Sequence, residues 1–252
     1  MIDIHSHILY KVDDGSSSMK DSIEIINQAI SNGVTDIVLT PHYISGSDYI
    51  STQRRNKILL NKLKKKISGI NLYLGNEVFA TEDIIDLFNQ KKISTLNDSK
   101  YMLIEFPVFT TFNNIENVVF QLMSKKIIPI IAHPERYIQL NYKNIVQLLE
   151  QGALIQCNVA SLYGDHGKRA KKFTKRLIKD GLVTFMAVDA HKAEKHSYSK
   201  IKKAQKLVSK LRSRSYAKNI FEENARRVIN NDELIISSSE EADRKKRKFF
   251  FF

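Results

Sequence analysis

The chain has 252 residues, a length that suits one large domain or two small ones. Hydrophobic residues make up 42% of the sequence, which is enough for a sizeable core and excludes a disordered chain. Forty Lys and Arg against 27 Asp and Glu leave a formal net charge of +13. This excess favours an anionic partner, which could be nucleic acid, an acidic membrane surface or a phosphorylated substrate.

The rest of the composition bears on compartment and domain organisation. A single cysteine, Cys157, excludes an internal disulfide framework and a thiolate zinc cluster, and it fits a reducing compartment. The sequence shows neither a secretory signal peptide nor the ~20 apolar residues of a membrane span. We therefore expect a cytoplasmic protein with one domain over residues 1–236. Residues 237–252 are polar, then basic, then four Phe, and we expect a disordered tail there.

Apolar, β-branched runs alternate along the chain with segments whose apolar residues recur at helical spacing. Most of the strand-like runs are continuously hydrophobic, as in parallel sheets with both faces buried. In chain order, the pattern predicts a strand over 2–7, a helix over 22–31, a strand over 36–41, a helix over 56–67, strands over 71–77 and 101–106, a helix over 114–124, a strand over 127–133, a helix over 144–151, a strand over 153–158, a helix over 168–180, a strand over 183–189 and a helix over 200–211.

The joins between these elements indicate a repeated strand–helix unit. Gly33, Gly152 and Gly181 each follow a predicted helix and precede a strand, as glycine at a helix C-terminus does. Successive strand ends lie 25 to 35 residues apart, close to the ~30 residues of a βαβ unit. The fold class is therefore α/β, either a βα barrel or a doubly wound sheet.

Histidines and carboxylates gather where the predicted strands end. In a parallel α/β fold the carboxyl ends of the strands open on one face, so these residues should converge there. The pair His5 and His7 has the two-residue spacing that puts both rings on one side of a strand, and Asp189 and His191 repeat it. The nine candidates, Asp14 being in the loop after the first strand, are His5, His7, Asp14, His42, Glu77, Glu105, His133, Asp189 and His191.

Imidazole and carboxylate ligands together suit zinc, manganese or iron. A single buried histidine is more often a satisfied core residue than a ligand. Buried carboxylates without cations are costly, however, and four of them near one face call for metal ions. Nine ligands exceed the needs of one ion, so we expect two or three. Clustered divalent ions activate water near neutral pH and clamp a phosphoryl group, which favours hydrolysis of a phosphate ester.

Several motifs then resemble the PHP superfamily (polymerase and histidinol phosphatase), and more narrowly the CpsB/CapC-type manganese-dependent protein-tyrosine phosphatases of bacterial capsule and exopolysaccharide systems. The resemblance covers residues 1 to about 191. It implies a single-domain, distorted TIM-like (β/α)7 barrel. The motifs that carry it are IDIHSHIL at 2–9, VDDG at 12–15, TPH at 40–42, GNE at 75–77, LIEFP at 103–107, IAHPERY at 131–137, NVASLYG at 158–164 and VDAH at 188–191.

The resemblance also implies three divalent ions, with Mn²⁺ favoured and Fe or Zn as alternatives. One ion would be held by His5, His7, Glu77 and Asp189. A second would take Glu77, Glu105 and His133, and a third Asp14, His42 and His191. The implied reaction is attack of metal-bound hydroxide on phosphotyrosine in the C-terminal tail of a partner tyrosine kinase that controls capsule synthesis.

Other functions stay open at the level of sequence. The alternatives are a histidinol-phosphate phosphatase, another PHP phosphoesterase or nuclease, and an inactive scaffold that recruits a kinase. We expect no nucleic-acid partner, because the chain lacks the aromatic-rich basic stripe of single-strand binders. The basic and Phe-rich end of the tail is a candidate for weak contact with an anionic membrane, against the alternative that it has no partner.

Three residues are candidates for catalysis itself, namely Arg136, Asp14 and His42. Arg136 follows the His133 ligand by three residues. From there its guanidinium could donate two parallel hydrogen bonds to phosphate oxygens. The alternative is a structural ion pair with a neighbouring carboxylate, Glu135 for example. Cys157 is expected to be an inert buried thiol, because no arginine follows it at the spacing of a cysteine phosphatase loop.

The chain departs from relatives of this kind after His191. They usually carry Asn and, a few residues later, Arg-Pro, whereas this chain has Lys192 and Lys195. Lysine offers a point charge instead of a bidentate fork, so a change in substrate preference is expected on this side of the site.

Overall fold

The computed structural model describes residues 1–195 and 197–234. Every strand pair is parallel, as the continuous hydrophobic runs predicted. The strands are β1 (Ile2–Asp3), β2 (Asp36–Leu39), β3 (His42–Tyr43), β4 (Asn71–Leu74), β5 (Glu77–Phe79), β6 (Tyr101–Glu105), β7 (Ile128–Ala132), β8 (Leu154–Asn158) and β9 (Phe185–Ala187).

The strands form two sheets, one ordered β1-β2-β4 and the other β3-β5-β6-β7-β8-β9. The predicted α/β class is confirmed, but the pairing does not close into the expected barrel within the described residues. Two predicted strands are each interrupted, at Thr40-Pro41 and at Gly75-Asn76. Pro41 has no N–H to donate to a neighbour, which breaks the ladder there. An isolated parallel bridge between Ser6 and Ala190 joins the chain after β1 to the chain after β9.

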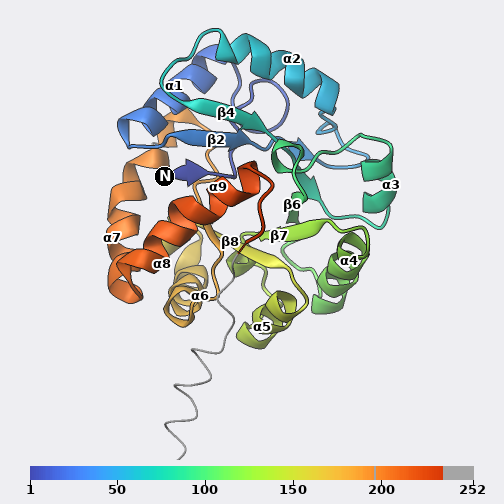
Figure 1. The fold of residues 1–252 in the computed structure, drawn as a ribbon, viewed down its shortest axis with the longest axis vertical. Coiled ribbons are helices and arrows are strands. Elements are labelled where there is room, and N and C mark those ends of the chain that lie inside the picture. Colours follow the sequence, from blue (N-terminus) through green and yellow to red (C-terminus); the bar gives the residue numbers. More distant parts are fainter. Residues whose placement is uncertain (196, 235–252) are drawn as a thin grey trace, which may run out of the picture.

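Helices surround the two sheets (Figure 1). The six predicted helices all form, and four begin two or three residues earlier than predicted because the side chains of Ser18, Thr52, Thr111 and Asn141 cap them. The short helices α3, α8 and α9 were not predicted. The helices are α1 (Met19–Ser31), α2 (Gln53–Lys64), α3 (Ile84–Asn89), α4 (Phe112–Ser124), α5 (Tyr142–Glu150), α6 (Gly167–Asp180), α7 (Ile201–Leu211), α8 (Arg214–Lys218) and α9 (Asn224–Ile229).

Two apolar cores leave one end of the strands free for a site. The larger core packs α1 to α7 against the outer faces of the sheets. The smaller core lies among the strands and includes Val228 and Ile229 of α9. The segment around α9 covers the amino ends of the strands, where Tyr101 at the start of β6 donates a 2.6 Å hydrogen bond to the Asp232 carbonyl. The carboxyl ends therefore remain available for polar side chains.

No helix in the described part of the chain is long and apolar enough to cross a membrane. The predicted tail over residues 237–252, with its candidate membrane contact, lies outside the described residues.

Candidate metal centre

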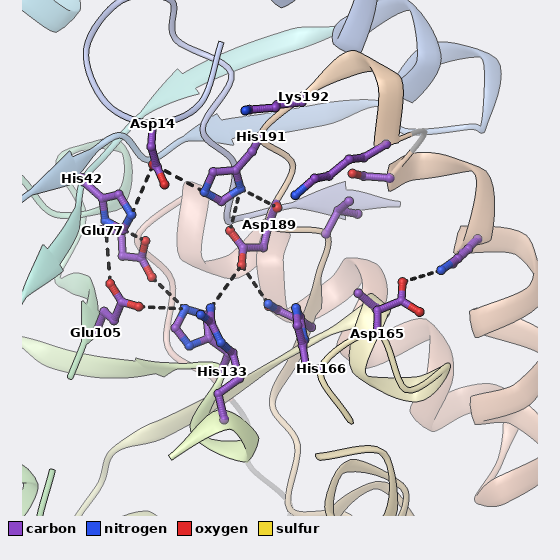
Figure 2. A pocket seen from close by; sticks show the side chains of 17 residues that line it. Asp14, His42, Glu77, Glu105, His133, Asp165, His166, Asp189, His191 and Lys192 are labelled. Carbon is purple, nitrogen blue, oxygen red and sulfur yellow. Dashed lines mark hydrogen bonds and ion pairs between the residues drawn. The ribbon is translucent and has the colours of Figure 1, made fainter. Parts of the chain in front are cut away.

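All nine predicted metal ligands lie together at the carboxyl ends of the strands. Figure 2 shows those that line a pocket there, which are all of them except His5 and His7. The nine ligands come from β3, β5 and β6 of the six-stranded sheet and from the loops after β1, β7 and β9. Their nitrogen and oxygen atoms form four overlapping groups, in each of which the ligand atoms lie within 4.8 Å of one another. The groups are His7, Asp14, His42 and His191; His5, His7 and Asp189; His5, Glu77 and His133; and His42, Glu77 and Glu105.

Glu77 lies at the middle of the cluster and is 1% exposed. Its Oε2 is 3.2 Å from His5 Nε2, 3.1 Å from His7 Nε2 and 3.1 Å from His42 Nδ1. Its Oε1 is 3.0 Å from His133 Nε2. One buried carboxylate thus faces four imidazoles, an arrangement that needs shared cations to be stable.

The outer hydrogen bonds of His5 and His7 fix where their lone pairs point. His7 Nδ1 donates to Asp13 Oδ2 at 2.8 Å, and His5 Nδ1 donates to Gln156 Oε1 at 2.9 Å. In a neutral imidazole the other nitrogen then carries a lone pair. The two Nε2 atoms are only 3.2 Å apart and both face Glu77. Lone pairs and a carboxylate that converge in this way form a site for positive ions.

A chain of amides links two ligands through β8. Gln156, which accepts from His5, donates through Nε2 to Asn158 Oδ1 at 2.8 Å. Asn158 in turn donates through Nδ2 to Asp189 Oδ2 at 2.8 Å. Because His5, Gln156 and Asn158 are buried and the Asp189 side chain is only 9% exposed, the chain sets the orientation of both His5 and Asp189. The other oxygen, Asp189 Oδ1, is buried and accepts no hydrogen bond from the described residues.

The outer part of the cluster is more exposed to solvent. The Asp14 side chain is 49% exposed, and its Oδ1 lies 3.7 Å from His42 Nε2 and 3.6 Å from His191 Nε2. Glu105 is 16% exposed and lies 3.8 Å from His42 and 3.6 Å from His133. This side of the cluster therefore faces the space where a substrate enters.

Burial and the neighbouring charges move the pKa values of the cluster apart. Burial disfavours the charged form of Glu77 and of Asp189, but the surrounding histidines outweigh it and hold both pKa values well below the usual range. Burial also opposes protonation of His5, yet Glu77 and Asp189 raise its pKa to about 9. Burial and the charge of Glu77 raise the pKa of Glu105 to about 7. Two carboxylates are thus ionised while a third holds a proton near neutral pH.

Backbone geometry at the strand ends brings the ligands inward. His133 has φ of 33° and Asp189 has φ of 58°, both in the left-handed region that residues with side chains rarely adopt. Gly15 packs so closely on the loop after β1 that an added Cβ would lie 1.9 Å from the His7 carbonyl oxygen. Tyr137 ties β6 to β7, since its hydroxyl donates to the Ala132 carbonyl and accepts from the Phe106 N–H.

A pocket of about 690 Å³ opens over the cluster. Arg136 lines it with a side chain that is 34% exposed, and its Nη1 lies 3.9 Å from Asp189 Oδ2. Glu135 is not its partner, because the buried Glu135 carboxylate accepts instead from Asn158 N and Ser161 Oγ. The neighbouring carboxylate that Arg136 approaches is Asp189, so its guanidinium lies in the wall of the pocket beside a candidate ligand.

Cys157 stands apart from this chemistry. It is fully buried in β8, and burial together with the charge of Glu135 raises its pKa well above the usual range. A thiol of this kind does not ionise at neutral pH and cannot act as a nucleophile. The expectation of an inert thiol agrees with this geometry.

The donor set fits divalent cations. Histidine nitrogens and carboxylate oxygens suit manganese, iron and zinc, and the buried Asp189 Oδ1 without a hydrogen bond needs a cation. The outer partners Asp13, Gln156 and Asn158 supply the hydrogen bonds that metal ligands ordinarily have. These nine side chains and their partners form a candidate metal centre.

Residues 1–230 match the model of a protein family described as capsular polysaccharide synthesis, CpsB/CapC. This chain belongs to the CpsB/CapC family. It is 42% identical over 197 residues to CapC of Staphylococcus aureus, which covers 76% of this chain and 77% of that protein. It is 34% identical over 203 residues to the tyrosine-protein phosphatase YwqE of Bacillus subtilis, covering 79% and 80% of the two chains.

The fold of this CpsB/CapC family member is also similar to solved structures. One, from work on YwqE of Bacillus subtilis and CpsB of Streptococcus pneumoniae, described as metal-dependent tyrosine phosphatases, has a TM-score of 0.83 and 31% identity. The match covers 93% of this chain and 96% of that one. Histidinol phosphate phosphatase of Lactococcus lactis has a TM-score of 0.54 at 12% identity, which shows a shared fold alone.

Proposed function

We propose that this chain is a metal-dependent protein-tyrosine phosphatase that acts in capsular or exopolysaccharide synthesis, with phosphotyrosine on a partner bacterial tyrosine kinase as its substrate. The observation that carries the proposal is the convergence of nine imidazole and carboxylate side chains beneath a pocket lined by Arg136. Relatives named tyrosine-protein phosphatases support it. The free thiol of Cys157 fits a cytoplasmic location.

Three divalent ions, Mn²⁺ in first place, would be divided among the nine ligands. His5, His7, Glu77 and Asp189 would hold one ion, Glu77 would be shared with a second completed by Glu105 and His133, and the third would take Asp14, His42 and His191. When bound, such ions supply an activated water near neutral pH and offset the charge of a phosphoryl group. The two parallel sheets would correspond to a distorted seven-stranded barrel that is open where β2 and β4 are interrupted.

The chain's own residues would bind and orient the phosphate ester. Arg136 donates its guanidinium N–H groups to phosphate oxygens from the wall of the pocket. Asp14 and His42 line the same pocket, and the half-exposed Asp14 carboxylate would accept a proton from the attacking water. The buried amides of Gln156 and Asn158 hold His5 and Asp189 in place during turnover.

A substrate panel separates this function from the alternatives. We expect the Mn²⁺-loaded protein to release phosphate from a phosphotyrosine peptide, with little release from histidinol phosphate and no cleavage of an oligonucleotide. Chelation with EDTA should abolish the release, and added Mn²⁺ should restore it. Preferred hydrolysis of histidinol phosphate would overturn the proposed substrate, and unchanged turnover after chelation would overturn the role of the metal.

A further inference from the structure

The wall of the pocket that follows the last strand is rich in lysine. Lys192, Lys195 and Lys200 all line the pocket and come from the segment directly after the candidate ligands Asp189 and His191. Figure 2 shows Lys192 beside His191, on the side of the pocket away from Glu105 and His133. Lys192 and Lys195 together form what we call the lysine rim.

The lysine rim differs from the other cations of the pocket in having no counter-ion. Lys200 is paired with Asp165, and Arg136 lies near Asp189. Within the residues that the structure describes, neither Lys192 nor Lys195 lies within 4.0 Å of a carboxylate oxygen. Both side chains are exposed. Two ammonium groups at the edge of a binding pocket without a protein partner favour an anion brought by the ligand.

The pocket is also larger than one phosphorylated side chain requires. Its volume of about 690 Å³ is within the roughly 300–1,000 Å³ of sites that hold a whole drug-sized ligand. With the scissile phosphate over the metal centre beside Arg136, space remains toward Lys192, Lys195 and Lys200. The neighbouring residues of a substrate peptide would occupy that space.

We propose that Lys192 and Lys195 form a second anion subsite, which binds a carboxylate or a second phosphate on the substrate chain next to the phosphotyrosine being hydrolysed. This inference rests on the proposed phosphatase function and specifies its substrate class as acidic or multiply phosphorylated peptides. Lysine suits such a role because its ammonium is a point charge that accepts either anion without a fixed geometry.

Peptide binding tests the subsite separately from catalysis. Three peptides would carry one non-hydrolysable phosphonate analogue of phosphotyrosine and differ in the next residue, which is Ala, Glu or phosphotyrosine. Their Kd values for the Mn²⁺-loaded protein would be measured by fluorescence anisotropy at low salt. We expect the two acidic peptides to bind roughly 1.5-fold to fivefold more tightly than the Ala peptide, which is the range that one exposed ion pair of about 0.2–1 kcal/mol gives.

Matched variants then assign this preference to the lysine rim. Lys192→Ala with Lys195→Ala should bring the ratio of Kd values close to one, and Lys195→Arg, which keeps the charge, should retain it. Lys210→Ala is the control, because Lys210 is exposed in the last turn of α7 and does not line the pocket. Thermal melting would verify that each variant is folded.

Two results would overturn the subsite. One is equal binding of all three peptides by the unaltered protein. The other is a double variant that binds every peptide more weakly but keeps the same ratio, because the lysines would then serve the scissile phosphate itself. Failure of the phosphatase function would be visible separately, as absence of phosphate release from the hydrolysable phosphotyrosine peptide.

Discussion

The two sides of the pocket hold charge in different ways. On one side, Glu77, His5, His7 and His133 are almost fully buried and His42 is 12% exposed, and the outer nitrogens of His5 and His7 have fixed partners. On the other side, Lys192 and Lys195 are exposed and have no counter-ion among the described residues. Buried charges interact strongly and are weakly screened, whereas exposed charges interact weakly and are screened by salt. The buried side is therefore suited to chemistry and the exposed side to choosing a substrate.

Removal of the central carboxylate should have the largest effect. Glu77→Gln keeps the shape of the side chain but removes the negative charge that faces four imidazole nitrogens. Replacement of an outer partner of a metal ligand already costs about 10–100-fold, so we expect at least a 100-fold loss of phosphate release together with loss of bound metal. Metal content by mass spectrometry and phosphotyrosine turnover would measure both.

The matched control for this variant is Glu82→Gln, which removes an exposed carboxylate that does not line the pocket. It should retain both metal and turnover. A Glu77→Gln protein that bound metal and turned over substrate normally would contradict the position of Glu77 at the centre of the site.

The amide chain through β8 should have the next largest effect. Asn158→Ala leaves Asp189 Oδ2 without its donor, and Gln156→Ala frees the ring of His5. We expect each variant to bind metal about 10–100-fold more weakly while remaining folded. Calorimetric titration with Mn²⁺ would measure the affinity. Asn113→Ala, at an exposed amide in α4, provides the comparison, and equal affinities would show that the chain does not orient the ligands.

The metal ligands could be predicted from the sequence, whereas the residues that hold them in place could not. The ligands were found because histidine and carboxylate types at strand ends are chemically distinctive, and parallel strands bring their carboxyl ends together. Gln156, Asn158 and Tyr137 are common core polar residues, and only their hydrogen bonds reveal a role. The motif that contains Asp13 was noticed, but its partner His7 could be assigned only from the structure.

The fold likewise has features that the hydrophobic pattern predicts and features that depend on tertiary contacts. Seven hydrophobic runs predicted the parallel strands, because burial of both faces is visible in the sequence. The interruptions after β2 and β4 depend on which backbone groups find partners, as at Thr40, whose N–H donates to the Ser6 carbonyl. Helix α9 is only six residues long, so its periodicity was too short to detect before its packing at the amino ends of the strands was known.

Metal binding should strengthen as pH rises. In the metal-free protein the pKa of His5 is about 9 and that of Glu105 is about 7, so both hold protons on the acid side of these values. A metal ion needs the same lone pairs and must displace those protons. We expect the affinity for Mn²⁺ to fall by roughly tenfold for each pH unit between about 9 and 7, where His5 gives up one proton, and by roughly a hundredfold for each unit below about 7, where Glu105 gives up a second. Titrations between about pH 6 and 8 in buffers of different ionisation enthalpy would count the protons released.

Glu105→Gln gives this pH dependence a control, since the amide cannot take up the proton. The variant should bind metal more weakly and with a shallower dependence on pH near 7. An unaltered protein whose metal affinity stayed constant over this range would contradict the raised pKa of Glu105.

The salt concentration should have a smaller effect, and it should act on substrate binding at the exposed lysines more than on turnover at the buried metal centre. Raising the salt from about 0.05 M to 0.5 M shortens the screening length from roughly 14 Å to 4 Å. The KM for an acidic phosphotyrosine peptide should rise several-fold, because exposed Lys192 and Lys195 are screened, whereas kcat should change little. Steady-state kinetics with peptides that have acidic or neutral flanks would show the difference. A salt effect of equal size on both peptides would place its origin elsewhere on the basic surface.

The smallest effect is expected at the single thiol. Cys157 is close in sequence to Gln156 and Asn158, yet its side chain is buried away from the pocket and its raised pKa keeps it protonated. Cys157→Ser should cost about 1–3 kcal/mol of folding stability, because a hydroxyl replaces a thiol in the core. It should leave kcat for phosphotyrosine unchanged once the folded fraction is taken into account. A large fall in kcat with intact metal content would mean that Cys157 itself supports the reaction, in addition to the side-chain amides of Gln156 and Asn158.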